Sequence, residues 1–257
     1  MEIDIDFTRS AQDNANSYYQ SSKKLQQKKE GARKAIAELE KKLEQARKSD
    51  EMSRKVAKLK AAPKEWYQKF RWAIASDGSI IIGGRDASQN EQLNSRHFED
   101  ADLFFHADIF GASVVILKGG ASSPKEVREE TAQFAACYSS AWKEGSSSVD
   151  VYAMRREQVS KSTAKGSLGS GSFLLTGERE WYRSTPLSLS AYVSGERLFV
   201  VPSRTYERLK DKPQRLEISP GDDKKSDAAK KMAKMLNYYD LDEIMQRLPA
   251  GEFTVRR

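Results

Sequence analysis

The sequence predicts an α+β fold: a long N-terminal coiled-coil helix, then a mostly antiparallel sheet with one main packing helix, and short C-terminal helices. Three observations predict this class. Residues 1–62 are rich in lysine and carry apolar residues at seven-residue spacing. From Trp66 onward, short apolar runs alternate with turn signals, and hairpin patterns outnumber strand–helix–strand patterns. A single well-marked amphipathic helix interrupts these runs at residues 122–145.

The N-terminal arm, residues 1–62, is predicted to form one helix of about 40 residues, roughly 60 Å long. Its apolar positions form one seam and its lysines and arginines crowd the other faces, so the seam needs a partner. A solvated coiled coil without any RNA contact is the alternative interpretation. The two registers of the seam are Tyr18, Leu25, Ala32, Leu39 and Ala46, and Ala15, Ser22, Lys29, Ile36 and Leu43.

The globular region is predicted to begin after Pro63, which ends the arm. Residues 70–84 predict two strands joined by Asp77-Gly78, a strong short-range hairpin signal. The region 186–203 predicts two more strands around a turn at 194–196. Other strands are expected near residues 103–106, 113–117, 148–154 and 171–180.

The main helix lies in SSPKEVREETAQFAACYSSAWKEG, residues 122–145. Ser123 is the expected cap, Glu126 completes a capping box, and Gly145 ends the helix. The polar stretch 219–226 is expected to be a linker, followed by two short helices in DAAKKMAKMLNYY and LDEIMQRL. We therefore divide the chain into a coiled-coil arm (1–62), a globular domain (63–205), and a linker with a helical tail (206–257).

Composition bounds the function. The chain has 44 Lys and Arg against 37 Asp and Glu, a net charge of +7 and a pI near 9.3, which favours nucleic acid first and an anionic membrane second. No apolar run approaches the roughly 20 residues that span a bilayer. The N-terminus lacks a secretory pattern, and the one cysteine, Cys137, excludes a disulfide framework. We expect a cytoplasmic protein.

The stretch IIIGGRDASQNEQL, residues 80–93, is the first candidate site. Gly83-Gly84 lets a ligand or another strand approach the backbone, and Arg85 offers a planar fork for a phosphate. Asp86 and Asn90 supply further hydrogen-bonding groups. The alternative is a tight turn held by a salt bridge from Arg85 to Asp86 or Asp108.

The second candidate is FFHADIFGAS, where His106 and Asp108 point to the same side of a strand. A His–Asp pair can ligate a metal, and with Asp86 it could serve a metal-dependent phosphoesterase. The chain has two histidines and one cysteine, so a hydrogen-bonded pair that shapes a surface is the favoured interpretation. We expect neither a metal nor another cofactor.

A basic loop follows in MRREQVSKSTAKGSLGSGSF, residues 154–173. Its cations and hydroxyls suit backbone phosphates, although GxxxxGK[ST] is absent and the loop is not a P-loop. A disordered surface loop is the alternative. The candidate phosphate ligands are Arg155, Arg156, Ser160, Lys161, Lys165 and Ser172. We expect Arg85 to lie beside this cluster.

The stretch GEREWYRS, residues 177–184, interleaves arginines with aromatic rings. Arg179, Trp181, Tyr182 and Arg183 could stack on unpaired bases, or they could be ordinary strand residues with one buried face. The sequence contains no G-x-S-x-G motif, zinc-ligand spacing or dinucleotide fingerprint. A catalytic role is therefore not favoured.

Four long stretches resemble one family. KFRWAIASDGSIIIGGRDASQNEQL, FFHADIFGASVVIL, CYSSAW and VSKSTAKGSLGSGSFLLTGERE are similar to the NFACT-R domain, the RNA-binding domain of the ribosome quality-control NFACT proteins, in the form shared by archaea and eukaryotes. The resemblance covers about residues 66–195 and implies that the globular domain binds RNA. EIDIDFTRSAQDNANSYY resembles the second arm of the coiled-coil hairpin that precedes this domain.

The resemblance implies a non-enzymatic RNA-binding module that acts on the large ribosomal subunit carrying a stalled nascent chain on tRNA. Its implied partners are rRNA of the large subunit and tRNA, with no membrane. A generic RNA-binding protein or a coiled-coil adaptor is the alternative. The family's pattern falls on Gly83, Gly84, Arg85, Asp86, Asn90, His106, Asp108, Gly111, Ser160, Lys161, Gly171 and Ser172.

The resemblance also implies a partner for the arm. The family's N-terminal region and the first coiled-coil arm are not in this sequence. The expected partner is that region, another helix, or a second copy of this chain through the arm.

Overall fold

The computed structural model describes residues 4–61, 65–163, 166–169 and 171–257, with the backbone alone described at 48–61, 162–163 and 166–167. Pro63 and Lys165 lie outside the described residues. The chain divides into two compact units, Met1–Lys60 and Ala61–Arg257.

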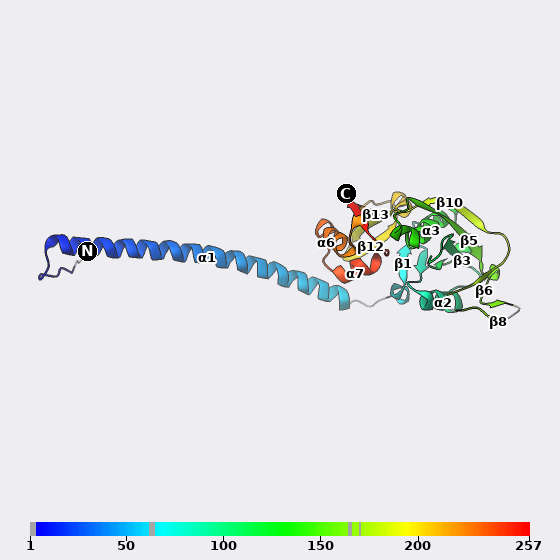
Figure 1. The fold of residues 1–257 in the computed structure, drawn as a ribbon, viewed down its shortest axis with the longest axis horizontal. Coiled ribbons are helices and arrows are strands. Elements are labelled where there is room, and N and C mark those ends of the chain that lie inside the picture. Colours follow the sequence, from blue (N-terminus) through cyan, green and yellow to red (C-terminus); the bar gives the residue numbers. More distant parts are fainter. Residues whose placement is uncertain (1–3, 62–64, 164–165, 170) are drawn as a thin grey trace. The chain divides into compact units, whose positions relative to one another are not determined.

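The first unit is dominated by one helix, α1 (Ala11–Ala61), which at 51 residues is longer than predicted (Figure 1). Ser10 begins it, because its Oγ accepts a hydrogen bond from the Asp13 main-chain N–H at 3.1 Å. The apolar seam is exposed in the single chain, with Leu25 at 65% and Leu39 at 63% of full exposure. The long helix is confirmed, and its pairing in a coiled coil stays a prediction.

The second unit contains an antiparallel sheet of six strands in the order β1-β2-β4-β3-β5-β10. The predicted hairpin at Asp77-Gly78 is confirmed, with Gly78 at a φ of 91° in the turn. The antiparallel α+β class is confirmed as well. The strands are β1 (Arg71–Ile74), β2 (Ile80–Gly83), β3 (Leu103–Ala107), β4 (Val115–Leu117), β5 (Ser148–Arg155) and β10 (Glu180–Pro186).

Helix α3 (Lys125–Cys137) packs on one face of this sheet, against β3, β5 and β10 (Figure 1). The predicted helix at 122–145 is confirmed in part, because the chain turns at Tyr138 and continues as α4 (Ser140–Lys143). The predicted capping box was wrong. The N-cap is Pro124, and Ser123 Oγ instead donates to the Gly119 carbonyl at 3.3 Å.

The opposite face of the sheet carries a second apolar cluster that includes Trp72, Phe104 and Met154. Alternation along each strand produces both faces, as at Phe104 and Phe105, which are 1% and 0% exposed. This second cluster packs under η1 (Trp66–Lys69) and α2 (Ala87–Arg96), which contribute Tyr67 and Leu93. The candidate turn at 83–90 therefore includes the end of β2, the short connection after it, and the first turn of α2, the helix that covers this face.

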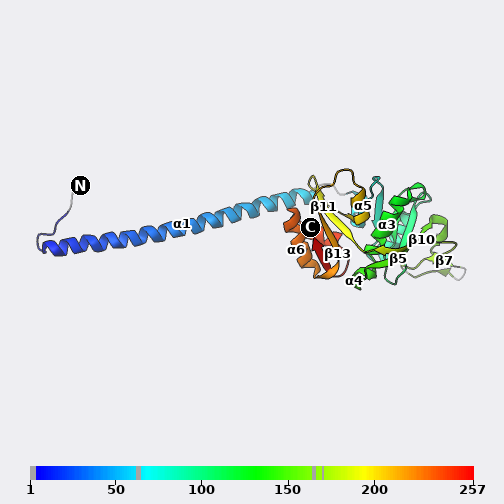
Figure 2. The same ribbon diagram turned by 90° about the horizontal axis from the view of Figure 1, so that it is seen from above.

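A second antiparallel sheet has the order β12-β11-β13-β14. Its strands β11 and β13 are labelled in Figure 2. The turn predicted at 194–196 is confirmed, and so are the two C-terminal helices, α6 (Lys225–Leu236) and α7 (Leu241–Arg247). The linker prediction at 219–226 was wrong, because most of it lies in β13, where Leu216 and Ile218 are fully buried. The remaining elements are β11 (Leu189–Ser194), β12 (Arg197–Pro202), α5 (Ser203–Arg208), β13 (Arg215–Asp223) and β14 (Phe253–Arg256).

The basic loop of residues 154–173 contains short regular elements. After η3 (Arg156–Gln158), β6 (Val159–Ser160) pairs with β9 (Leu174–Leu175), and β7 (Ser162–Thr163) pairs with β8 (Gly166–Ser167). The strand predicted at 171–180 is therefore confined to Leu174–Leu175 and the start of β10. A further turn, η2 (Gly120–Ser122), precedes α3.

Candidate functional site

The turn at Gly83–Asn90 is held mainly by its own side chains. Asn90 Oδ1 accepts a hydrogen bond from the Val114 main-chain N–H at 3.1 Å, while the Gly84 N–H donates to the Val114 carbonyl at 3.0 Å. Asp86 caps α2 by accepting from the Gln89 N–H at 2.8 Å. Asp86 and Asn90 thus build the turn, as in the alternative interpretation, although no Arg85 salt bridge forms in the described part of the chain.

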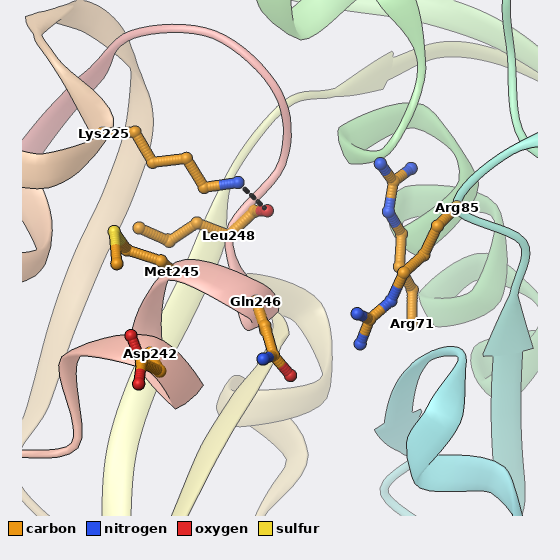
Figure 3. A pocket seen from close by; sticks show the side chains of 7 residues that line it. All are labelled: Arg71, Arg85, Lys225, Asp242, Met245, Gln246 and Leu248. Atoms are coloured by element: carbon orange, nitrogen blue, oxygen red, sulfur yellow. Dashed lines mark hydrogen bonds between the residues drawn. The ribbon is translucent and has the colours of Figure 1, made fainter.

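Arg85 leaves this turn and enters a pocket of about 510 Å³. Arg71 from β1 and Lys225 from α6 line the same pocket, which we call the cationic pocket (Figure 3). Arg85 donates one hydrogen bond to the Phe70 carbonyl at 3.3 Å, and its buried Nε has no partner among the described residues. Asp242, Met245, Gln246 and Leu248 complete the lining.

His106 and Asp108 do not form the expected pair with each other. Asp108 lies 3.8 Å from an Arg179 guanidinium nitrogen, and His106 Nδ1 lies 3.3 Å from the Tyr152 hydroxyl. Burial lowers the pKa of His106 below its ordinary value, so the neutral form of the ring predominates at pH 7. Among the described residues, no group of three His, Cys, Asp or Glu is placed to hold a metal ion.

Arginines cover the aromatic rings at the β5–β10 edge. The Arg179 guanidinium carbon lies 4.4 Å from the Tyr152 ring centroid, and that of Arg183 lies 3.8 Å from the Trp181 centroid. Arg183 also pairs with Asp150 at 2.6 Å. Tyr152 is buried, and Trp181 and Tyr182 are half-buried strand residues, which agrees with the second interpretation of this stretch. Stacking on unpaired bases stays a prediction.

Arg155 ends β5 and lines a second pocket, of about 340 Å³, together with Arg128 and Arg179. Its side chain is exposed and makes no ion pair with any described residue. Arg156 is engaged locally, because it donates to the Val159 carbonyl at 2.9 Å and covers the Phe98 ring at 5.2 Å.

Lys161 ties the basic loop to α2. Its Nζ lies 3.2 Å from a Glu91 carboxylate oxygen and 2.9 Å from the Gly169 carbonyl, and it covers the Phe173 ring at 5.5 Å. Ser160 is paired in β6, and the Ser172 side chain is exposed. Lys161 therefore has a role in shaping the loop that the sequence did not indicate.

The predicted site divides into two regions. Arg155 and Arg179 share the second pocket, beside Asp108, whereas Arg85 lies in the cationic pocket. The expectation that Arg85 joins the basic cluster was wrong, because its side chain turns towards the Phe70 carbonyl. Sequence reasoning missed Arg71 and Lys225 as site residues, since one sits in a hairpin strand and the other in the presumed linker.

Residues 69–177 match the family described as the NFACT protein RNA binding domain. Residues 69–177 are an NFACT-R domain. The chain is homologous to the Rqc2, NEMF and aRqcH ribosome quality-control proteins of archaea and eukaryotes. The turn at 83–90, His106, Arg155 and Lys161 fall inside the NFACT-R domain, whereas Arg179, Arg183 and Lys225 lie C-terminal to it.

The relatives are much longer than this chain. It is 33% identical over 211 residues to the archaeal Rqc2 homolog aRqcH of Methanocaldococcus jannaschii, covering 79% of this chain and 30% of that protein. It is 35% identical over 175 residues to the human ribosome quality control complex subunit NEMF, covering 65% and 16%. The chain spans less than a third of the length of the curated relatives it matches.

One solved structure is also similar, the C-terminal part of the fibronectin/fibrinogen-binding protein from Streptococcus suis. It shares 28% identity, and the match covers 49% of each chain with a TM-score of 0.40. Across the residues with described positions, no helix of this chain is both long and apolar enough to cross a membrane.

Proposed function

We propose that this chain is a non-enzymatic RNA-binding module of ribosome-associated quality control in the cytoplasm. It would bind the large ribosomal subunit that carries a stalled nascent chain on tRNA. Three facts support the proposal: the NFACT-R domain, the homology to ribosome quality-control proteins, and the net charge of +7. Its contacts would be to rRNA or tRNA phosphates.

One observation carries the assignment of the surface. We call Arg155, Arg179 and Arg183 the arginine surface. Arg155 ends β5, Arg179 directly precedes the edge strand β10, and Arg183 lies in β10. Arg155 makes no ion pair with the described residues, and the other two pair with carboxylates that are 50% and 34% exposed. Solvent-exposed ion pairs contribute little, so a phosphate can replace the carboxylate partner.

The basic arm adds a second set of charges. Between residues 11 and 47 its lysines and arginines are exposed along α1. If the arm and the arginine surface together neutralise roughly 4–8 phosphates, affinity falls steeply with salt. The arm's seam would be covered by a helix of the family's N-terminal region or by a second copy of the chain.

The test is co-sedimentation of the full chain with large subunits, small subunits and whole ribosomes over a salt series. Selective retention on the large subunit, lost steeply with salt, is the expected result. Equal weak binding to every particle and to bulk RNA would instead favour a generic RNA-binding protein. No RNA affinity together with self-association in analytical ultracentrifugation would favour the coiled-coil adaptor.

Charge reversal then tests the arginine surface. Arg155→Glu should weaken RNA binding and reduce the salt slope by about 1 for each phosphate that the variant no longer neutralises. Lys210→Glu is the matched control, since Lys210 is equally exposed but lies on the connection after α5. Arg156 and Lys161 are poorer choices, because their reversal would also break contacts to Val159 and Glu91. Equal slopes for Arg155→Glu and the wild type would overturn this assignment.

A further inference from the structure

The cationic pocket concentrates positive charge, because three cations share it with one carboxylate, Asp242, among the described residues that line it. Arg71, Arg85 and Lys225 line it, and none of the three forms an ion pair with a described residue. Their polar atoms bond instead to neutral groups: Arg71 to Ser113 Oγ at 2.8 Å, Arg85 to the Phe70 carbonyl, and Lys225 to the Leu248 carbonyl at 3.0 Å. The Nε of Arg85 is buried without a partner among the described residues.

These cations also repel one another. Burial lowers the pKa of Lys225 to about 8, and the neighbouring charges of Arg71 and Arg85 contribute to that shift. Burial likewise lowers the pKa of Arg71, and Arg85 adds to that effect. Burial also lowers the pKa of Arg247, which lies next to Trp72, and the charge of Arg85 contributes to that shift. A bound anion would offset this repulsion.

The opposite wall of the cationic pocket has a different chemistry. Figure 3 shows the guanidinium groups of Arg71 and Arg85 facing Lys225 and the α7 side chains across the pocket. Half-buried Met245 offers apolar surface there, and the exposed Gln246 amide offers both a donor and an acceptor. Of the lining residues that the structure describes, Asp242 alone carries a carboxylate.

We infer that the cationic pocket binds a nucleoside monophosphate, free or as the terminal nucleotide of an RNA, with its phosphate held by Arg71, Arg85 and Lys225. A phosphate monoester carries close to two negative charges at pH 7, which suits three cations better than a single carboxylate does. The base would lie against Met245, with its edge towards Gln246. A volume of about 510 Å³ is within the range of small-ligand sites.

The inference rests on the proposed function only for the source of the nucleotide. The first experiment is calorimetry on the full chain with adenosine, AMP, UMP and inorganic phosphate at pH 7. The second compares one short RNA carrying a 5′-phosphate, a 3′-phosphate or no terminal phosphate. We expect AMP or UMP to bind and adenosine not to bind. If RNA ends are the source, one terminal phosphate should raise affinity about tenfold, as a charge-assisted contact does.

Two neighbouring lysines provide the matched variants. Lys225→Met should remove the mononucleotide binding and the terminal-phosphate advantage, whereas Lys224→Met should keep both, because Lys224 is exposed and does not line the pocket. Urea unfolding of each variant identifies any loss of folding. Gln246→Leu changes an exposed position with little risk to the fold, and it should also weaken mononucleotide binding.

The outcomes separate this inference from the proposed function. Mononucleotide binding that needs Lys225 supports the pocket even if ribosome binding fails. A phosphate preference that persists in Lys225→Met, or equal affinity for adenosine and AMP, overturns it even if the arginine surface binds RNA. Binding of an acidic peptide but not of AMP, dependent on Lys225, would show that the pocket takes a carboxylate and would overturn the nucleotide assignment.

Discussion

Asn90 Oδ1 accepts a hydrogen bond from the Val114 main-chain N–H at 3.1 Å, directly across the turn made by Gly84. A Cβ atom on residue 84 would lie 2.0 Å from that oxygen and 2.9 Å from the Asn90 main-chain nitrogen. Gly84 is not among the glycines with positive φ, so the requirement for glycine here is one of space. The sequence indicates a binding site at this polar turn. In the structure, its polar groups mainly hold the connection between β2 and α2 in place.

Gly84→Ala should therefore destabilise the second unit by about 1–3 kcal/mol, the usual cost of forcing extra atoms into packed surroundings. Urea unfolding followed by tryptophan fluorescence measures it, because all four tryptophans lie between residues 66 and 181. Gly169→Ala is the control, since a Cβ there meets nothing within 4 Å. Equal urea midpoints for the two variants would show that the turn accommodates the extra methyl group without loss of stability.

Local patterns predicted the parts of this fold that depend on neighbours in sequence. The Asp77-Gly78 hairpin, the main helix and the two C-terminal helices follow from turn residues and periodicity. The strand β13 has a local signal too, since Leu216 and Ile218 alternate with exposed Glu217. The polar residues 219–223, which follow in the same strand, led to the interpretation of this region as a linker.

The site was less predictable because its residues converge from distant elements. Asp86 precedes a helix with Gln89 at the capping distance, so its role as a cap was readable from sequence. The position of the Arg85 side chain was not predictable, because the cationic pocket forms only once α7 packs against β1 and α6 packs against α7. A sequence pattern records which side chains are cationic, and tertiary packing decides which of them meet.

Glu130 is a fully buried carboxylate that joins α3 to its surroundings. It accepts hydrogen bonds from Ser76 Oγ at 2.6 Å and Thr205 Oγ1 at 2.9 Å, and it pairs with Arg208 at 3.3 Å. Glu130→Ala should destabilise the protein by about 3 kcal/mol, because it leaves buried donors and an arginine without their acceptor.

Glu129→Ala is the matched control for that change. Glu129 is the adjacent residue and pairs with Arg204 and Arg208 at 3.6 and 3.3 Å, but it is partly exposed. Its removal should cost about 0–1 kcal/mol, as is usual for exposed ion pairs. Urea unfolding of both variants gives the comparison, and similar destabilisation would show that the buried network contributes no more than a surface pair.

The two histidines should both titrate below their ordinary range. Burial lowers the pKa of His97, helped by Lys69 and Lys118, and burial also lowers the pKa of His106. The unfolded chain then binds protons more readily than the folded one, so stability should fall as pH drops below about 6.5. Proton NMR titration of the two rings checks this, with His97→Gln assigning the resonances. A titration midpoint above 6.5 for either ring would contradict it.

A consequence for RNA binding follows from a neutral His106. Because the neutral form of the ring predominates at pH 7, His106→Gln should leave the salt slope of RNA binding unchanged within error. Arg155→Glu, measured in the same assay, should change it. Equal reductions in slope for the two variants would mean that His106 is charged when RNA is bound.

The pH dependence of stability provides a separate test of the cationic pocket. The pKa of Lys225 is about 8 in the folded chain against 10.5 ordinarily, so between these values the unfolded state binds more protons. The free energy of unfolding should then rise with pH from about 8 to about 10.5 in the wild type, and Lys225→Met should lack this rise. The groups that face Lys225 are Arg71, Arg85, the Asp242 carboxylate and the Leu248 carbonyl.

Urea unfolding at several pH values, with Lys224→Met as the control, measures that difference. The free energy of unfolding should change with pH in parallel for the wild type and the control. Below pH 8, Lys225→Met should be more stable relative to both than it is at pH 10.5. Added AMP should move the rise to higher pH, because a bound phosphate favours the charged ammonium and raises its pKa. Curves for Lys225→Met that run parallel to the wild type would show that the folded chain leaves this ammonium unperturbed. The repulsion among the three cations would then be too weak to require an anion.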